Sequence, residues 1–98
     1  MKMHAVLVGL MAFPLSGPAV AQTIDVSALA SACSICHGKN AEGSDAIPGL
    51  RGQQQAYLAE QLRAFKSGAR PATVMTRFAK GYTDEEIAGL ALYFSRLK

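Results

Sequence analysis

The 98-residue sequence predicts a small all-α domain with long irregular loops. Three segments repeat apolar residues at helical spacing, and each has a capping residue before it or a glycine after it. No segment shows the alternation of β-branched residues that is typical of a strand. Half of the residues are apolar and only 17% are charged, which favours a folded chain over a disordered one. The net charge of +3 and the absence of tryptophan argue against a nucleic-acid-binding surface.

Residues 1–21 have the pattern of a secretory signal peptide. Lys2 provides a basic start, residues 5–15 are uncharged and almost wholly apolar, and Ala19-Val20-Ala21 matches an A-x-A cleavage site. A helix of about eleven residues rises only about 16 Å, against a membrane core of about 30 Å. We therefore expect cleavage after Ala21 rather than retention as an anchor. Residues 22–98 then form one exported domain in an oxidising compartment, the periplasm.

The first expected helix begins at a cap, either Asp25 or Ser27, and ends at His37 before a glycine. The second covers residues 53–67 and again ends before a glycine. Its apolar and amide side chains recur at helical spacing: Tyr57, Leu58, Gln61, Leu62 and Phe65.

The last expected helix has the clearest start. Thr83 and Glu86 have the spacing of a capping box, and the acidic residues of the first turn suit the positive end of the helix dipole. The apolar residues that follow form one stripe: Ile87, Leu90, Ala91, Phe94 and Leu97.

Two loops are expected between the helices, over residues 38–52 and 68–82. Loops of about fifteen residues are uncommon in a compact domain unless something is bound against them. A domain this small also needs a staple in many cases. A buried prosthetic group would supply the missing core, so we expect the protein without it to be largely unfolded.

Residues 33–37 read Cys-Ser-Ile-Cys-His, which is the C-x-x-C-H pattern of covalent haem attachment. Positions three and four apart share a helix face, so Cys33, Cys36 and His37 can converge on one flat macrocycle. Each thiol would form a thioether with a haem vinyl group, and the imidazole would reach the iron. Export agrees with this prediction, because haem c is attached outside the cytoplasm.

Other interpretations of the cysteine pair remain open. A thioredoxin-type redox pair shares C-x-x-C, but it belongs near a βαβ pattern, and no strands are predicted. A structural zinc site needs four ligands, and Cys33, Cys36 and His37 are only three. A plain disulfide is the third alternative. We predict one covalently bound haem c.

Met75 is the candidate for the second axial ligand beside His37. It is the only methionine in residues 22–98, and that range contains no second histidine. Ligation by histidine and methionine raises the reduction potential of a haem. The alternatives are a core-filling Met75, a lysine ligand and an open sixth position. An open position would suit a haem enzyme or a gas sensor, and stable binding of carbon monoxide would reveal it.

The order of these features resembles the class I cytochrome c family over almost all of residues 22–98. This resemblance implies about three main helices with long loops wrapped around one haem. Residues 46–53 are similar to short bacterial monohaem cytochromes. Residues 65–86 are similar to the haem subunit of flavocytochrome c sulfide dehydrogenase, and they read FKSGARPATVMTRFAKGYTDEE.

The resemblance implies further residue roles. Pro48 corresponds to the proline whose carbonyl accepts a hydrogen bond from the iron-binding imidazole, with a simple loop proline as the alternative. Thr76 follows Met75 where the commonest pattern has proline, a variation associated with the sulfide dehydrogenase branch. Tyr93 and Phe94 correspond to the aromatic pair at which the first and last helices cross.

The activity that the resemblance implies is one-electron transfer, with no catalysis by the chain alone. The expected partner is a flavoprotein that oxidises sulfide; the alternative is a free carrier between respiratory or photosynthetic complexes. Six basic residues are candidates for neutralising the haem propionates or forming a docking rim, although a solvated surface charge is the commoner role for each: Arg51, Arg63, Lys66, Arg70, Arg77 and Lys80.

Overall fold

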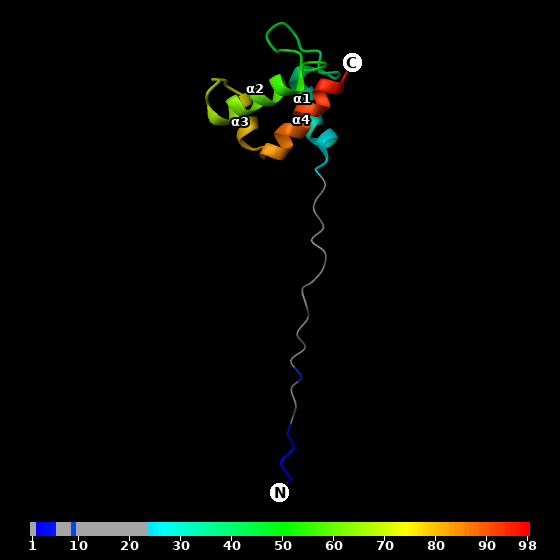
Figure 1. The fold of residues 1–98 in the computed structure, drawn as a ribbon, viewed down its shortest axis with the longest axis vertical. Helices are drawn as coiled ribbons and strands as arrows, with labels where there is room; N and C mark the ends of the chain where they lie inside the picture. The colour runs from blue at the N-terminus through cyan, green and yellow to red at the C-terminus, as the bar shows by residue number, and fades with distance from the viewer. Residues whose placement is uncertain (1, 6–8, 10–23) are drawn as a thin grey trace.

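The computed structural model describes residues 2–5, 9 and 24–98, and Figure 1 shows that the helices gather in the C-terminal part of the chain. The helices of the described residues are α1 (Val26–His37), α2 (Gln55–Ser67), α3 (Met75–Lys80) and α4 (Asp84–Arg96). The described residues form no β-strand, and their only strand-like pairing is an isolated bridge between Ser44 and Ile47. The predicted all-α class is confirmed.

Residues 1–21, predicted as a signal peptide, lie largely outside the described residues, so cleavage after Ala21 stays a prediction. The longest helices of the described part, α2 and α4, have 13 residues each. None of the described helices has the length and apolar character that a membrane span requires.

Local hydrogen bonds explain where α1 begins and ends. The Asp25 carboxylate accepts hydrogen bonds from the Ala28 amide and the Ser27 hydroxyl, so Asp25 is the cap and Ser27 supports it. The hydrogen bond from Ser27, and to a smaller extent that from Ala28, lowers the pKa of the Asp25 carboxyl. Gly38 follows the helix with a φ of +98°, a conformation that favours glycine.

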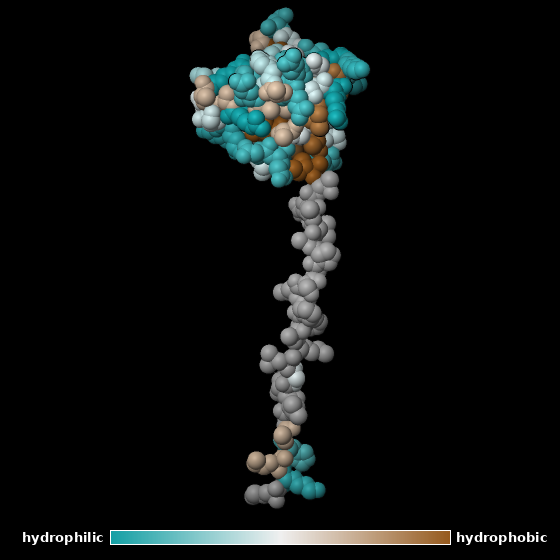
Figure 2. Space-filling model, in the orientation of Figure 1, coloured by the Kyte–Doolittle hydropathy of each residue, from teal (hydrophilic) through white to brown (hydrophobic). Residues whose placement is uncertain are grey.

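Helix α4 forms the centre of the core, where it packs against both α1 and α2 (Figure 1). The buried residues of α4 are four of the five in the predicted apolar stripe: Ile87, Leu90, Ala91 and Phe94. Helix α1 contributes Ala30 to this core, and α2 contributes Leu58. Polar residues cover most of the face of the folded part seen in Figure 2, with smaller apolar patches between them.

Helices α1 and α4 meet at a position that the sequence interpretation missed. A Cβ atom at Gly89 would lie 2.8 Å from Cγ2 of Val26, so the absence of a side chain allows the two helices to approach. Further along α4, the rings of Tyr93 and Phe94 meet edge to face with their centroids 5.2 Å apart. Phe94 and Ala30 belong to the same buried cluster. This cluster therefore joins α1 to the aromatic pair of α4, where the resemblance places the crossing of the first and last helices.

The predicted loop over residues 68–82 is wrong for residues 75–80, which form α3. Six residues are too few to show helical periodicity, and Val74 supplies no side-chain cap. Ala79 is fully buried and α3 contacts α2, so packing rather than local sequence stabilises this helix. The second helix also begins slightly later than predicted, at Gln55.

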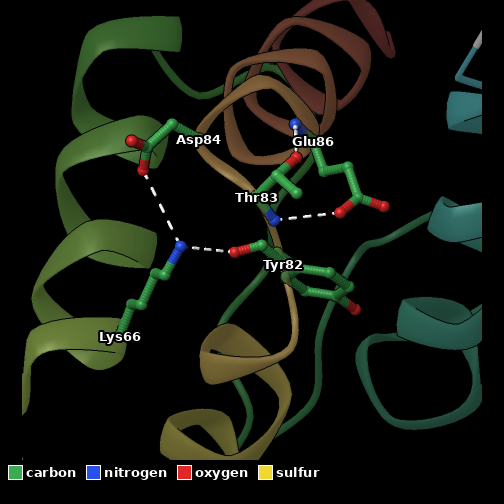
Figure 3. A network of polar contacts seen from close by, with 5 residues as sticks. All are labelled: Lys66, Tyr82, Thr83, Asp84 and Glu86. Atoms are coloured by element: carbon green, nitrogen blue, oxygen red, sulfur yellow. Dashed lines mark hydrogen bonds and ion pairs between the residues drawn. The ribbon is translucent and has the colours of Figure 1, made fainter.

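A polar network joins α2 to the start of α4 (Figure 3). The Lys66 ammonium donates a hydrogen bond to the Tyr82 carbonyl and lies 3.8 Å from the Asp84 carboxylate. Beside it, the Thr83 amide donates to the Glu86 carboxylate at 2.9 Å, and the Glu86 amide donates to the Thr83 hydroxyl at 3.1 Å. The predicted capping box is confirmed.

Thr83→Ala is expected to destabilise the protein by about 1 kcal/mol, because an amide of the first turn of α4 loses its acceptor. Denaturant unfolding of the haem-loaded protein measures this change. Thr76→Ala is the matched control, because its hydroxyl bonds only the carbonyl of Ala72 on the exposed surface. Equal stability of the Thr83 variant and the wild type would contradict the capping role.

Candidate haem site

The last turn of α1 brings the three residues of the C-x-x-C-H motif to one cavity. Cys33, Cys36 and His37 all line it. His37 is buried, Cys33 is half-buried and Cys36 is exposed, so the motif runs from the interior to the surface. Ile35, between the cysteines, is 85% exposed and does not line the cavity. The helical spacing therefore places the motif as predicted.

The cavity has a volume of about 380 Å³, within the range of small-molecule and cofactor sites. One wall is the face of α2 whose apolar and amide side chains recur at helical spacing: Tyr57, Leu58, Gln61, Leu62 and Phe65. Buried residues of α4 form part of its floor: Leu90, Ala91 and Phe94. This face of α2 therefore encloses space for a ligand.

The imidazole of His37 is oriented by the loop that follows α1. Its Nδ1 atom lies 2.7 Å from the carbonyl oxygen of Pro48. A carbonyl only accepts hydrogen bonds, so this contact places the proton on Nδ1 and leaves Nε2 with a free lone pair. Such an imidazole is prepared to bind a metal through Nε2.

A close backbone approach holds Pro48 against His37. The amide of Gly43 donates to the His37 carbonyl at 2.7 Å. Gly43 has a φ of +75°, and a Cβ atom there would lie 2.5 Å from the Gly49 nitrogen. Only glycine fits this crossing, which brings the segment carrying Pro48 back to the end of α1. The sequence interpretation assigned no role to these glycines.

Met75 is the first residue of α3 and lines the same cavity as the motif. Its side chain is half-buried, and the preceding residues Thr73 and Val74 also line the cavity. The structure thus brings the thioether of Met75 and the imidazole of His37, which are far apart in the sequence, to the same cavity.

The environment of Cys33 does not favour dithiol redox chemistry. Burial raises the pKa of the Cys33 thiol. The pKa of the Tyr82 hydroxyl is also raised, mainly by burial and next by the nearby Cys33. Redox-active cysteines have a lowered pKa, because the thiolate is the reacting form. A half-buried thiol with a raised pKa argues against a thioredoxin-type pair.

These residues fit a covalently bound haem. The cavity offers two thiols three residues apart, a buried imidazole with a free Nε2 and a thioether, within walls that are mainly apolar. Histidine and methionine are established axial ligands of haem iron. The donor set and the apolar walls therefore agree with the cofactor predicted from the motif.

Of the six basic residues considered above, only Arg70 lines the cavity within the part of the chain that the structure describes. Its guanidinium carbon lies 4.6 Å from the centroid of the Phe65 ring, and its Nη1 donates to Gln61. Lys66 is bound to Tyr82 and Asp84 instead. The remaining four are exposed: Arg51, Arg63, Arg77 and Lys80.

An all-α domain in which a C-x-x-C-H turn faces an apolar cavity has the fold and site of a c-type haem protein. Comparison with known proteins agrees with this: the chain belongs to the cytochrome c family, whose sequence model matches residues 25–98. The family has covalently bound haem c, and the residues Cys33, Cys36 and His37 fit its binding motif.

Two curated relatives illustrate the range of the family. The cytochrome subunit of sulfide dehydrogenase from Chlorobaculum tepidum is 45% identical over 69 residues, which are 70% of this chain and 63% of that protein. Cytochrome c-553 from Helicobacter pylori strain J99 is 39% identical over 102 aligned positions, which cover the whole of both chains. Both relatives are cytochromes by name, and this chain, as a member of the cytochrome c family, is an electron-transfer cytochrome.

Solved structures support the fold. Cytochrome c4 from Acidithiobacillus ferrooxidans superposes with a TM-score of 0.66 at 38% identity. The protein of the same name from Pseudomonas stutzeri gives a TM-score of 0.64 at 33% identity. Each alignment covers 67% of this chain but only 38% of the cytochrome c4 chain. The predicted class I cytochrome c fold is confirmed.

Proposed function

We propose that Cys33 and Cys36 hold the haem through thioethers and that His37 and Met75 are its axial ligands. The observation that supports this most directly is the cavity that all four side chains line. When bound, haem c supplies one centre that accepts and releases a single electron. Pro48 keeps the Nδ1 proton of His37 in place, and the apolar walls limit the access of water.

Replacing Cys33 by alanine is expected to leave a single thioether at Cys36 and to lower the yield of mature protein severalfold. The reverse change, Cys36→Ala, leaves the thioether at Cys33. Mass spectrometry and the alkaline pyridine spectrum distinguish one thioether from two. Ser34→Ala is the control, since its hydroxyl bonds only the Ala30 carbonyl. A normal yield of doubly linked haem in either cysteine variant would contradict the attachment.

We further propose that this cytochrome is the haem subunit of a sulfide dehydrogenase and accepts electrons one at a time from a sulfide-oxidising flavoprotein. The relative from Chlorobaculum tepidum carries this proposal, because its name gives that role and it is 45% identical over 69 residues. The resemblance of residues 65–86 to the same branch supports it. That segment contains Arg70, Met75 and Tyr82, which line the cavity.

The second candidate is a diffusible monohaem carrier between respiratory or photosynthetic complexes. Its support is the match to Helicobacter pylori cytochrome c-553, which covers both chains from end to end. Both candidates need export. We propose that residues 1–21 direct it and are removed, so that the protein works in the periplasm.

Size-exclusion chromatography of the native periplasmic protein, with detection of full absorbance spectra, separates the two candidates. Haem and flavin eluting together in a heavy peak support the sulfide dehydrogenase subunit. Haem that elutes without flavin near the mass of residues 22–98 supports the carrier. The run is repeated at protein concentrations far above those of the cell extract, so that a weak complex does not dissociate. No haem in any fraction would contradict both.

A further inference from the structure

One charged side chain that lines the cavity has no role in the haem site as described above. Among the described residues that line the cavity, Arg70 is the only one with a permanent charge. Arg70 is exposed as a whole residue, which places it at the opening of the cavity rather than in its floor. A cation at such an opening can reach a ligand inside while its own charge stays hydrated.

Helix α2 holds the Arg70 guanidinium in place. The guanidinium carbon lies 4.6 Å from the centroid of the Phe65 ring, so the ring supports one face of the group. Nη1 donates a hydrogen bond to Oε1 of Gln61. The backbone is fixed as well, because the Arg70 amide donates to the Ala64 carbonyl at 3.1 Å. The cation is therefore positioned before any ligand binds.

This arrangement leaves most of the hydrogen-bonding capacity of Arg70 for a ligand. A guanidinium has five N–H donors in a planar fork that matches a carboxylate, and Gln61 takes one of them. The residues that share the cavity are otherwise mainly apolar. A carboxylate that enters such a cavity needs a hydrogen-bonded partner to offset the loss of water.

Haem has carboxylates of this kind, its two propionates. We propose that the Arg70 guanidinium binds one haem propionate through the donors that Gln61 does not use. This inference rests on the haem site proposed above. Lys66 does not share the role, since its ammonium is bound to the Tyr82 carbonyl beside Asp84.

The test uses haem-loaded protein in which the propionate carboxyl carbons carry ¹³C. Redox-difference infrared spectra of the wild type, Arg70→Gln and Arg70→Lys are compared with those of Arg63→Gln, an exposed arginine of α2 that does not line the cavity. We expect a labelled carboxylate band to shift in both Arg70 variants and to stay in place in Arg63→Gln. We also expect a lower midpoint potential in Arg70→Gln only, because a lost cation favours the more positive ferric state.

The outcomes separate this inference from the haem site itself. Wild-type protein without covalent haem would overturn the site, and the alkaline pyridine spectrum shows this before any variant is made. Haem-loaded Arg70→Gln with an unmoved labelled band would overturn the propionate contact alone. An unmoved band with weaker binding to a redox partner would assign Arg70 to docking. If Arg70→Gln does not fold, Arg70→Lys decides, because an ammonium cannot reproduce the planar fork.

Discussion

Met75→Ala is expected to open the sixth coordination position of the iron and to lower the reduction potential. A thioether favours ferrous iron, so its loss stabilises the ferric state. The ferrous variant should bind carbon monoxide at neutral pH, and the wild type should not. Redox titration and carbon monoxide difference spectra measure the two effects.

Val74→Ala is the matched control for Met75, since Val74 is its neighbour and also lines the cavity. It removes apolar contact without removing a ligand, so the spin state and the carbon monoxide spectrum should stay as in the wild type. An unchanged potential and spin state in Met75→Ala would show that another residue binds the iron. Carbon monoxide binding by the wild type at ordinary affinity would point instead to a haem enzyme or gas sensor.

Gly43→Ala is expected to cost about 2–5 kcal/mol of stability. The left-handed conformation at Gly43, with φ of +75°, accounts for about 1–2 kcal/mol for a residue with a side chain. The new Cβ atom would also meet the Ile47 carbonyl oxygen at 2.6 Å and the Gly49 nitrogen at 2.5 Å, and relieving such overlaps costs a further 1–3 kcal/mol or so. Denaturant unfolding of the haem-loaded protein measures the sum.

Gly68→Ala separates these two contributions. Gly68 has a similar φ of +84°, but a Cβ atom there meets nothing within 4 Å, so only the conformational cost of about 1–2 kcal/mol applies. The Gly43 variant should also raise the reduction potential, because a displaced Pro48 carbonyl makes His37 a weaker electron donor. Equal stability losses at the two positions, with equal potentials, would refute the close approach.

The first and last helices could be predicted because their determinants are local. Asp25 and the pair Thr83 and Glu86 cap helices through residues three positions away, and such spacings are visible in a sequence. Helix α3 could not be predicted, since it has no side-chain cap and depends on the burial of Ala79. The role of Gly89 depends on a residue of another helix, Val26, and no local pattern contains that information.

Some residues of the candidate site could likewise be identified from the sequence, and others only from the fold. The motif residues and Met75 could be selected by residue type and scarcity, and the structure brings them to one cavity. Selecting Arg70 from six basic residues needed the folded chain, because its position depends on Phe65 and Gln61. The crossing at Gly43 is likewise a contact between backbone segments and has no signature in residue type.

The placement of the attachment residues has a consequence for biogenesis. Cys33, Cys36 and His37 lie on one helical turn, so the chain can present all three before any tertiary contact exists. Met75 and the walls of the cavity come together only when α2, α3 and α4 pack. Contacts between distant segments form late because loop closure costs entropy. We therefore expect maturation to begin with a cofactor tethered at one helical turn, around which the rest of the chain then packs.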